Sequence, residues 1–179
     1  MGPPGSGKGT QGRTIANSNQ FVTIVTGEML RSESTSGSDL GNDIKAVIDA
    51  GNLISDEMMN DIIEIHLENL EIPAGYGILF DGYPRTVEQA EFLDGIITID
   101  KVILLEVAEE VLIKRILKRG NISNRIDDKD KSIIKTRMDN YNSDTLPLKA
   151  YYEEQGKLVI LDGDKKVKDI HDEMVNALV

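Results

Sequence analysis

The first ten residues, MGPPGSGKGT, contain residue types that could bind phosphate. Gly2, Gly7 and Lys8 fit the spacing G-x-x-x-x-G-K, in which backbone N–H groups turn inward toward phosphate oxygens and the lysine reaches the outer phosphates. The alternative is a glycine-rich turn that only begins a helix, which is disfavoured because the lysine comes directly before a predicted helix. Gly9 stands where many such loops have a magnesium-binding serine or threonine, so a direct hydroxyl ligand is not expected there.

Arginine is the second residue type that suggests phosphate chemistry. The chain is acidic, with a formal net charge of −11, yet six of its seven arginines lie in or beside the motifs described below. An arginine fork suits a two-point grip on phosphate oxygens, although a single arginine is most often a solvated surface residue. The six are Arg31, Arg85, Arg115, Arg119, Arg125 and Arg137.

Two polar positions follow apolar runs that are typical of strands. Asp81 comes after YGILF, where it could hold magnesium through water, and Arg85 follows one turn later. Thr26 comes after FVTIV, and with Arg31 it could present a hydroxyl and a cation to a second nucleotide. Each position also has a plain alternative as a helix cap or a strand-end turn. Both lie where open α/β sheets bind their ligands.

Short apolar runs alternate with stretches of helical length, which is the pattern of a parallel sheet with crossover helices. The predicted strands are residues 21–25, 76–80, 101–107 and 157–161. The predicted helices are residues 8–19, 27–34, 39–50, 56–70, 87–93, 108–119, 129–155 and 167–178. The expected fold class is α/β, and 179 residues suit one domain.

Composition excludes several classes of protein. There is no cysteine, which excludes a disulfide framework, a cysteine zinc site and a thiol nucleophile. The negative charge argues against non-specific nucleic-acid binding, which needs a basic surface. No apolar run is long enough to span a bilayer and no charged-then-apolar leader is found, so we expect a cytoplasmic protein without a membrane partner. A monomer is the expected state.

Seven motifs occur in the order and spacing of one enzyme family. They are GPPGSGKGTQ, TGEMLR, GNLISDE, DGYPRTVEQAE, KRILKRG, NRIDD and TRMDNY. Over essentially the whole chain, the sequence resembles the adenylate kinase family of nucleoside monophosphate kinases in its short-lid form. The resemblance implies a P-loop fold of three α/β/α layers around a parallel sheet of five strands, four of which are predicted here. It also implies a single kinase domain over residues 1–179, an AMP-binding flap at 27–55 and a short lid loop at 120–128.

The implied reaction is a reversible, Mg²⁺-dependent transfer of phosphoryl from ATP to AMP, giving two ADP. The residues implied to bind ATP are Gly2, Gly5, Ser6, Gly7, Lys8, Gly9, Thr10, Arg115, Gly163 and Lys165. Those implied to bind AMP are Thr26, Arg31, Asn52, Leu53, Ile54, Gly82, Arg85 and Gln89. The implied catalytic set around the transferring phosphoryl group is Lys8, Arg85, Arg119, Arg125 and Arg137, and Asp81 would order the waters of magnesium.

The acceptor nucleotide can be argued from two positions. Thr26 and Gln89 stand where AMP-specific members of the family have threonine and glutamine, whereas the pyrimidine kinases usually have alanine and asparagine. A glutamine amide can both donate to and accept from the edge of adenine. AMP is therefore the expected acceptor, and a UMP/CMP kinase is the alternative within the enzyme class.

The phosphate loop raises one further question, because only Met1 precedes it. In the family, the strand that feeds this loop lies in the middle of the sheet. Four strands without it would leave a gap of roughly 10 Å between two neighbours, twice the usual spacing. We therefore expect the chain as given to fold poorly or to rearrange. Two hypotheses stay open: a working kinase in which Met1 is the last residue of that strand, or a shortened nucleotide-binding chain of poor activity.

Overall fold

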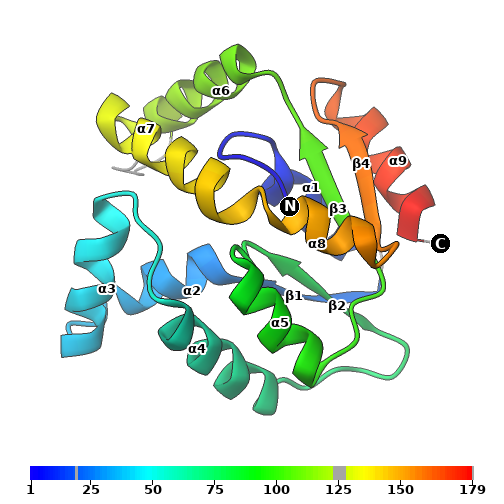
Figure 1. Cartoon of the computed structure of the whole chain (residues 1–179), viewed down its shortest axis with the longest axis horizontal. Coiled ribbons are helices and arrows are strands. Elements are labelled where there is room, and N and C mark those ends of the chain that lie inside the picture. The colour runs from blue at the N-terminus through cyan, green and yellow to red at the C-terminus, as the bar shows by residue number, and fades with distance from the viewer. Residues whose placement is uncertain (19, 123–127, 179) are drawn as a thin grey trace.

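The structure is a computed structural model that describes residues 1–18, 20–122 and 128–178 (Figure 1). Within these residues the strands are β1 Phe21–Val25, β2 Gly77–Asp81, β3 Val102–Glu106 and β4 Leu158–Asp162. The helices before β3 are α1 Lys8–Ser18, α2 Thr26–Glu33, α3 Asp39–Asp49, α4 Asp56–Glu68 and α5 Val87–Ile96. Those after it are α6 Glu109–Ile122, α7 Lys131–Asn140, the π-helix η2 Tyr141–Thr145, α8 Leu148–Glu154 and α9 Val167–Leu178. The α/β architecture expected from the alternating pattern is confirmed.

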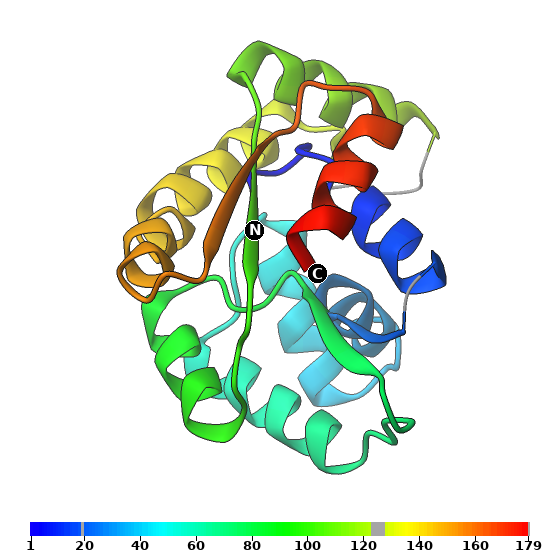
Figure 2. The same ribbon diagram turned by 90° about the vertical axis from the view of Figure 1, so that its right-hand side faces the viewer.

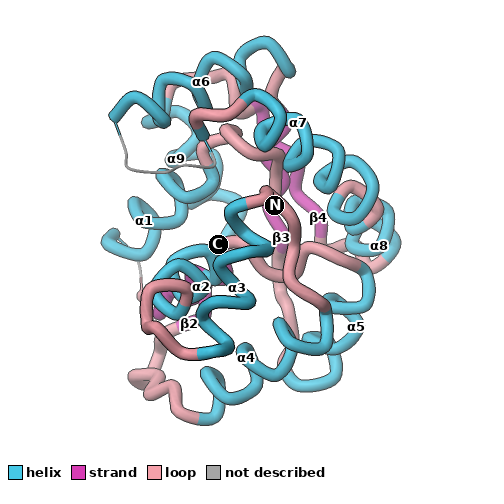
Figure 3. The backbone as a smooth tube through the Cα atoms, turned by 90° about the vertical axis from the view of Figure 1, so that its left-hand side faces the viewer, coloured by secondary structure: helices cyan, strands magenta, loops and turns pink. Residues whose placement is uncertain are grey.

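The strands form two parallel pairs rather than one continuous sheet. β1 pairs with β2, with Phe21 opposite Gly77, and β3 pairs with β4, with Val102 opposite Leu158. In the described part of the chain, β2 and β3 are not paired with each other. Figure 3 shows the two pairs of strands at separate places among the helices. The gap expected from the strand count therefore lies between β2 and β3.

Helices cover both faces of the strands. On one face, α1 packs on β1, β2 and α9, and α9 packs on β4. The core there is formed by Ile15, Leu105, Ile170 and Met174. On the opposite face, α5 contacts α8, and α8 packs on β4 around the fully buried Tyr152. Figure 2 shows this layering from the side. Because side chains alternate along a strand, each strand contributes to both layers.

A third cluster lies under the segment that joins β1 to β2. Helices α2, α3 and α4 surround the buried side chains of Ile24, Ile44 and Ile63. Two of these helices begin with a serine cap: the Ser38 hydroxyl accepts from the N–H of Gly41, and the Ser55 hydroxyl accepts from the N–H of Met58. Local capping and an apolar inner face therefore hold this segment in its helical form.

One predicted helix is wrong in its extent. Residues 129–155 were expected to form a single helix, but the structure has α7, the π-helical turn η2 and α8 in their place. Pro147 lacks an N–H donor, and its ring crowds the carbonyl of residue 143. The N–H of Leu146 instead donates to the carbonyl of Tyr141, one residue farther back than in an α-helix. The wider turn accommodates the proline.

Other predicted boundaries differ from the observed ones by a few residues at most. In the described residues, no helix has both the length and the apolar character needed to cross a membrane.

Candidate active site

The predicted phosphate loop lies at the carboxyl ends of the strands. The N–H of Leu105 on β3 donates to the carbonyl of Met1 at 3.1 Å, which places the start of the loop beside β3. The turn after β4 joins the same edge, because the N–H of Gly163 donates to the carbonyl of Glu106 at 2.7 Å. This is the edge at which open parallel sheets bind ligands.

The loop needs glycine for both its backbone angles and its contacts. Gly2, Gly5 and Gly7 have φ values of 145°, 84° and 98°. A Cβ atom on Gly5 would lie 2.9 Å from the carbonyl of Leu112, whereas one on Gly7 would point into open space. In the described part of the chain, the N–H groups of Gly5 and Gly7 have no hydrogen-bond partner. The loop therefore presents backbone donors in the form of an anion nest.

Ser6 adds an unusual feature to the loop. Its side chain is 1% exposed, and its hydroxyl has no hydrogen-bond partner among the described residues. A buried hydroxyl without a partner costs free energy, so a ligand that pairs with it would bind more tightly. The donors and the orphaned hydroxyl together fit a phosphate chain.

Lys8 begins α1 at the centre of a positively charged group. Its ammonium donates to the carbonyl of Pro3 at 3.3 Å. Burial and the charges of Arg85, Arg137 and Arg119, which Asp81 opposes, together lower the pKa of Lys8 from 10.5 to about 7. The predicted catalytic residues that the structure describes therefore act on one another electrostatically. An anion placed among them would relieve their mutual repulsion.

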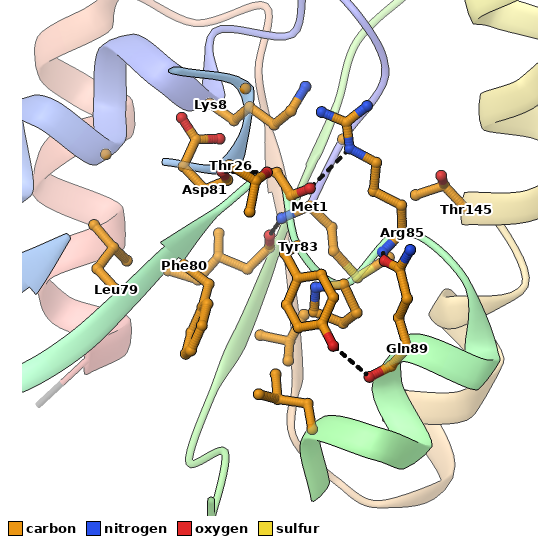
Figure 4. Close-up of a pocket in the computed structure, with 18 of the residues that line it drawn as sticks. Met1, Lys8, Thr26, Leu79, Phe80, Asp81, Tyr83, Arg85, Gln89 and Thr145 are labelled. Atoms are coloured by element: carbon orange, nitrogen blue, oxygen red, sulfur yellow. Dashed lines mark hydrogen bonds between the residues drawn. The ribbon is translucent and has the colours of Figure 1, made fainter. Parts of the chain in front are cut away.

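Asp81 lies beside the first turn of α1. Its Oδ2 atom would be 3.2 Å from a Cβ atom on Gly9. A residue with a side chain at position 9 would crowd that carboxylate, which gives a physical reason for glycine where serine or threonine is common. Figure 4 shows Asp81 and Lys8 on the same side of the pocket, with Arg85 opposite.

The turn after β2 brings together three residues predicted to bind AMP. The Thr26 hydroxyl donates to the carbonyl of Asp81 at 3.4 Å, and Arg85 Nε donates to the carbonyl of Gly82 at 2.8 Å. Gly82 has a φ of 93°, and a Cβ atom there would lie 2.7 Å from the Thr26 hydroxyl. Burial and the charge of Arg137 lower the pKa of Arg85. Any larger residue at position 82 would displace both neighbours.

Gln89 is buried, and both the oxygen and the nitrogen of its side-chain amide form hydrogen bonds. Its Oε1 accepts from the backbone N–H of Arg85 at 2.7 Å, and its Nε2 donates to Asp56 Oδ1 at 2.7 Å. The hydroxyl of Tyr83 donates to the carbonyl of Gln89 at 3.3 Å (Figure 4). The residue predicted to recognise adenine is thus fixed in place before any ligand binds.

Asp128, for which the sequence motifs predict no role, joins two of the predicted catalytic arginines. Its side chain is 0% exposed, and its Oδ1 accepts from Arg137 Nη1 at 2.7 Å and from Arg119 Nη2 at 2.8 Å. Arg119 Nε donates to Oδ2 at 2.5 Å. Burial alone would raise the pKa of Asp128, but the hydrogen bonds and charges of both arginines outweigh it and lower that pKa. The motif NRIDD contains the residue but does not reveal its partners.

The other residues predicted to bind ATP lie near α6 and the turn after β4. Arg115 Nη1 donates to the carbonyl of Gly163 at 2.9 Å and to that of Ser6 at 3.5 Å. This bridge brings α6, the phosphate loop and the turn together. Lys165 differs, because its ammonium is paired with Glu173 on α9 at 2.6 Å. Arg125 lies outside the described residues, as does most of the predicted lid loop.

The residues predicted to bind AMP line one cavity of about 500 Å³. Its walls include Thr26, Arg31, Asn52, Leu53, Ile54, Gly82, Arg85 and Gln89, together with Lys8 and Arg137. One contact from α7 supports the wall formed by residues 52–54: Asn140 Nδ2 donates to the carbonyl of Gly51 at 3.2 Å. Of the predicted ATP-binding residues, Gly2 and Lys8 line this cavity and the other eight do not, so the two predicted nucleotide sites meet at Gly2 and Lys8.

Comparisons with known proteins agree with this geometry. Residues 1–157 match the family model described as adenylate kinase. A protein named adenylate kinase from Caulobacter sp. (strain K31) is 43% identical over 175 residues, covering 95% of this chain and 91% of that protein. Proteins of the same name from Synechococcus sp. (strain CC9902) and Petrotoga mobilis are 39% and 35% identical, each covering 99% of this chain and at least 95% of the relative. The chain therefore belongs to the adenylate kinase family.

Proposed function

We propose that this chain catalyses reversible phosphoryl transfer from ATP to AMP, giving two ADP. The observation that carries the proposal is the convergence of Lys8, Arg85, Arg137 and Asp81 beside a glycine loop with unpartnered N–H groups. Such a group suits a transfer in which negative charge passes between two phosphates. Membership of the adenylate kinase family supports it, and no observation favours UMP or CMP as the acceptor.

The ATP side is assigned to the loop and α6. Backbone donors and the Ser6 hydroxyl would hold the phosphates, and Lys8 would reach the outer ones. The Arg115 guanidinium lies against the Gly163 carbonyl, where it could stack on a purine base. The short lid, residues 120–128, would supply Arg125 to the transferring group.

The AMP side is assigned to the cavity. Thr26 and Gln89 would contact the base, while Arg31 and Arg85 would bind the phosphate. Residues 27–55, which contain most of α2 and all of α3, would act as the AMP-binding flap. Its closure would exclude the water that otherwise hydrolyses ATP.

The residues present fit Mg²⁺ held through water. In the described residues, no group of three or more histidine, cysteine, aspartate or glutamate side chains could bind a metal ion by itself. Magnesium usually keeps several waters and binds through one or two carboxylates plus substrate phosphates, which matches the single Asp81 carboxylate beside the loop. When bound, the ion would neutralise charge on the β- and γ-phosphate oxygens.

The protein side chains have three tasks in the transfer. An oxygen of the AMP phosphate attacks the γ-phosphorus, and the bond to the oxygen bridging the β- and γ-phosphates breaks, so no covalent enzyme intermediate is needed. Lys8 and the arginines stabilise the charge on the phosphoryl group as it moves. Asp128 holds Arg119 and Arg137 in position, and the two binding sites keep donor and acceptor in line.

An acceptor panel tests the proposal. ADP formation from ATP is measured with AMP, UMP or CMP, each at several concentrations, and kcat/KM is compared. We expect AMP to be preferred over both pyrimidine nucleotides. A preference for UMP or CMP would replace the proposal by the pyrimidine alternative. ATP binding without turnover of any acceptor would favour a nucleotide-binding chain of poor activity.

Proton uptake on ATP binding should reveal the state of Lys8. Its pKa of about 7 in the free protein leaves the side chain largely neutral near about pH 8.5, and bound phosphates would raise that pKa toward its ordinary value. Binding should therefore take up nearly one proton at about pH 8.5 and almost none at about pH 6, where Lys8 is already protonated. Calorimetric titrations in two buffers of different ionisation enthalpy measure this number. Equal uptake by the Lys8→Met variant would contradict the assignment.

A further inference from the structure

The side-chain amide of Gln89 is held in one of its two orientations. Its Oε1 accepts from the N–H of Arg85 and its Nε2 donates to Asp56 Oδ1, both at 2.7 Å. If the amide were turned over, its oxygen would face the Asp56 carboxylate and its nitrogen would face the Arg85 N–H. Both hydrogen bonds would then be lost in a side chain that is 3% exposed. The observed orientation is therefore strongly favoured.

The two partners of this amide come from segments that border the cavity. Arg85 lies in the turn between β2 and α5, and its Nε donates to the carbonyl of Gly82 at 2.8 Å. Asp56 is the first residue of α4 and directly follows residues 52–54, which line the cavity with Gln89. The amide is thus fixed relative to two walls of the cavity, one on each side of it.

The fixed amide still has capacity for a ligand. A glutamine amide has two N–H donors and an oxygen with two lone pairs. Asp56 uses one donor and Arg85 uses one lone pair, which leaves one of each. Gln89 lines the cavity, so the remaining donor and acceptor can pair with two neighbouring atoms of a base. Which of them donates and which accepts is already decided by the protein.

This order suits one class of purine base. An amino group at C6 of a purine donates, and the ring nitrogens on either side of that carbon accept in adenine. Gln89 Oε1 can therefore accept from the amino group while Nε2 donates to a ring nitrogen. A 6-oxopurine has an acceptor oxygen at C6, which would face Oε1 in the same position of the base. Two acceptors that face each other without a proton repel, and neither is satisfied.

We propose that Asp56 is a positioning residue for the choice of acceptor: it holds the Gln89 amide in the orientation that pairs with a 6-aminopurine nucleotide and opposes a 6-oxopurine nucleotide such as IMP. The inference rests on the proposed function, because it places the base of the acceptor nucleotide in the cavity. Asp56 acts through Gln89 and contacts no atom of the base. The selectivity comes from an introduced mismatch as well as from a matching contact, since the amide cannot turn over to suit the other base.

Dissociation constants for AMP and IMP, measured by calorimetry, test the role of Asp56. The full chain should bind AMP about 10²-fold more tightly than IMP, which has an oxygen in place of the amino group. In Asp56→Ala the amide is released on one side, so this ratio should fall by about tenfold. AMP should bind more weakly, whereas IMP should bind as well as before or better. A merely structural role would weaken the binding of both nucleotides alike.

Two control variants separate the hydrogen bond from the charge. Asp56→Asn keeps an acceptor oxygen for Gln89 Nε2, so the AMP-to-IMP ratio should stay within about threefold of the original. Glu57→Ala removes an exposed carboxylate from the same first turn of α4 and should leave the ratio unchanged. An unchanged ratio in Asp56→Ala would overturn the proposal, and so would an equal fall in Glu57→Ala.

A second measurement needs no variant. Hydrogen exchange of the Gln89 side-chain amide is followed by NMR, and the N–H that remains free for the base should exchange about tenfold more slowly with saturating AMP. IMP should not slow it. Equal protection by both nucleotides would overturn the proposal.

The outcomes also separate this inference from the proposed function. AMP-selective binding without ADP formation would contradict the phosphoryl transfer alone and leave the role of Asp56 standing. ADP formation by a chain that binds AMP and IMP equally would overturn the role of Asp56 alone. Binding of neither nucleotide would overturn both.

Discussion

Replacing Lys8 with methionine is expected to lower kcat for ADP formation by about 10²- to 10³-fold, the size of effect seen when one preorganised charge-stabilising group is removed. Methionine has a similar length but no charge and no N–H donor. The loss should appear mainly in kcat, because Lys8 stabilises the negative charge on the phosphoryl group during the transfer. Steady-state rates with saturating ATP and AMP measure it.

The stability of the same variant separates a chemical effect from unfolding. Because the pKa of Lys8 is lowered in the folded chain, its charged form is less favourable there than in the unfolded chain. At about pH 6, where the side chain is protonated in both states, the variant should melt at the same temperature or higher. Lys168→Met, an exposed change on α9, is the matched control and should leave kcat unchanged. A Lys8→Met enzyme with normal kcat would contradict the proposed role.

Replacing Asp128 with asparagine is expected to lower kcat by about 10²-fold, because Arg119 and Arg137 would lose the carboxylate that positions them. Among the described contacts, Arg119 uses two of its five N–H groups on Asp128, which leaves three for phosphate. Without the carboxylate, two like charges face each other and repel. The free energy of unfolding should also fall, by about 1–3 kcal/mol.

A neighbouring carboxylate provides the control for this variant. Asp130 is exposed and caps α7 by accepting from the N–H of Ser132 at 2.7 Å. Asparagine caps a helix as well as aspartate does, so Asp130→Asn makes the same chemical change with little expected effect. Rate measurements on both variants should show the loss for Asp128 alone, with KM for the nucleotides changed less than kcat. A raised KM with unchanged kcat would mean that Asp128 supports binding rather than positioning.

The parts of the site that could be predicted from the sequence are local ones. The phosphate loop was predicted from the spacing of Gly2, Gly7 and Lys8. The structure gives the reason for the glycines, because Gly2 and Gly7 both have positive φ angles. Strand β1 has the predicted bounds and β2 starts one residue later than predicted, because apolar runs bounded by turns are a strong local signal. The arginines were found by type, since an acidic chain that keeps them within motifs indicates phosphate.

Contacts between distant segments could not be predicted in this way. Asp128 is nine residues from both Arg119 and Arg137, and only folding brings the three side chains within hydrogen-bonding distance. Gln89 was expected to meet a base, but the pairing of its amide with Asp56 depends on how α4 packs beside α5. The break in the helix predicted at 129–155 depends on a single proline, whose effect the helical periodicity hid.

The sequence by itself determined most of the elements, the phosphate loop and the family, because hydrophobic period and motif spacing are properties of short stretches. Only the tertiary structure decided that the strands form two parallel pairs instead of one continuous sheet. The physical reason is that strand pairing and side-chain partners are set by distances between segments far apart in the chain, which no local pattern specifies.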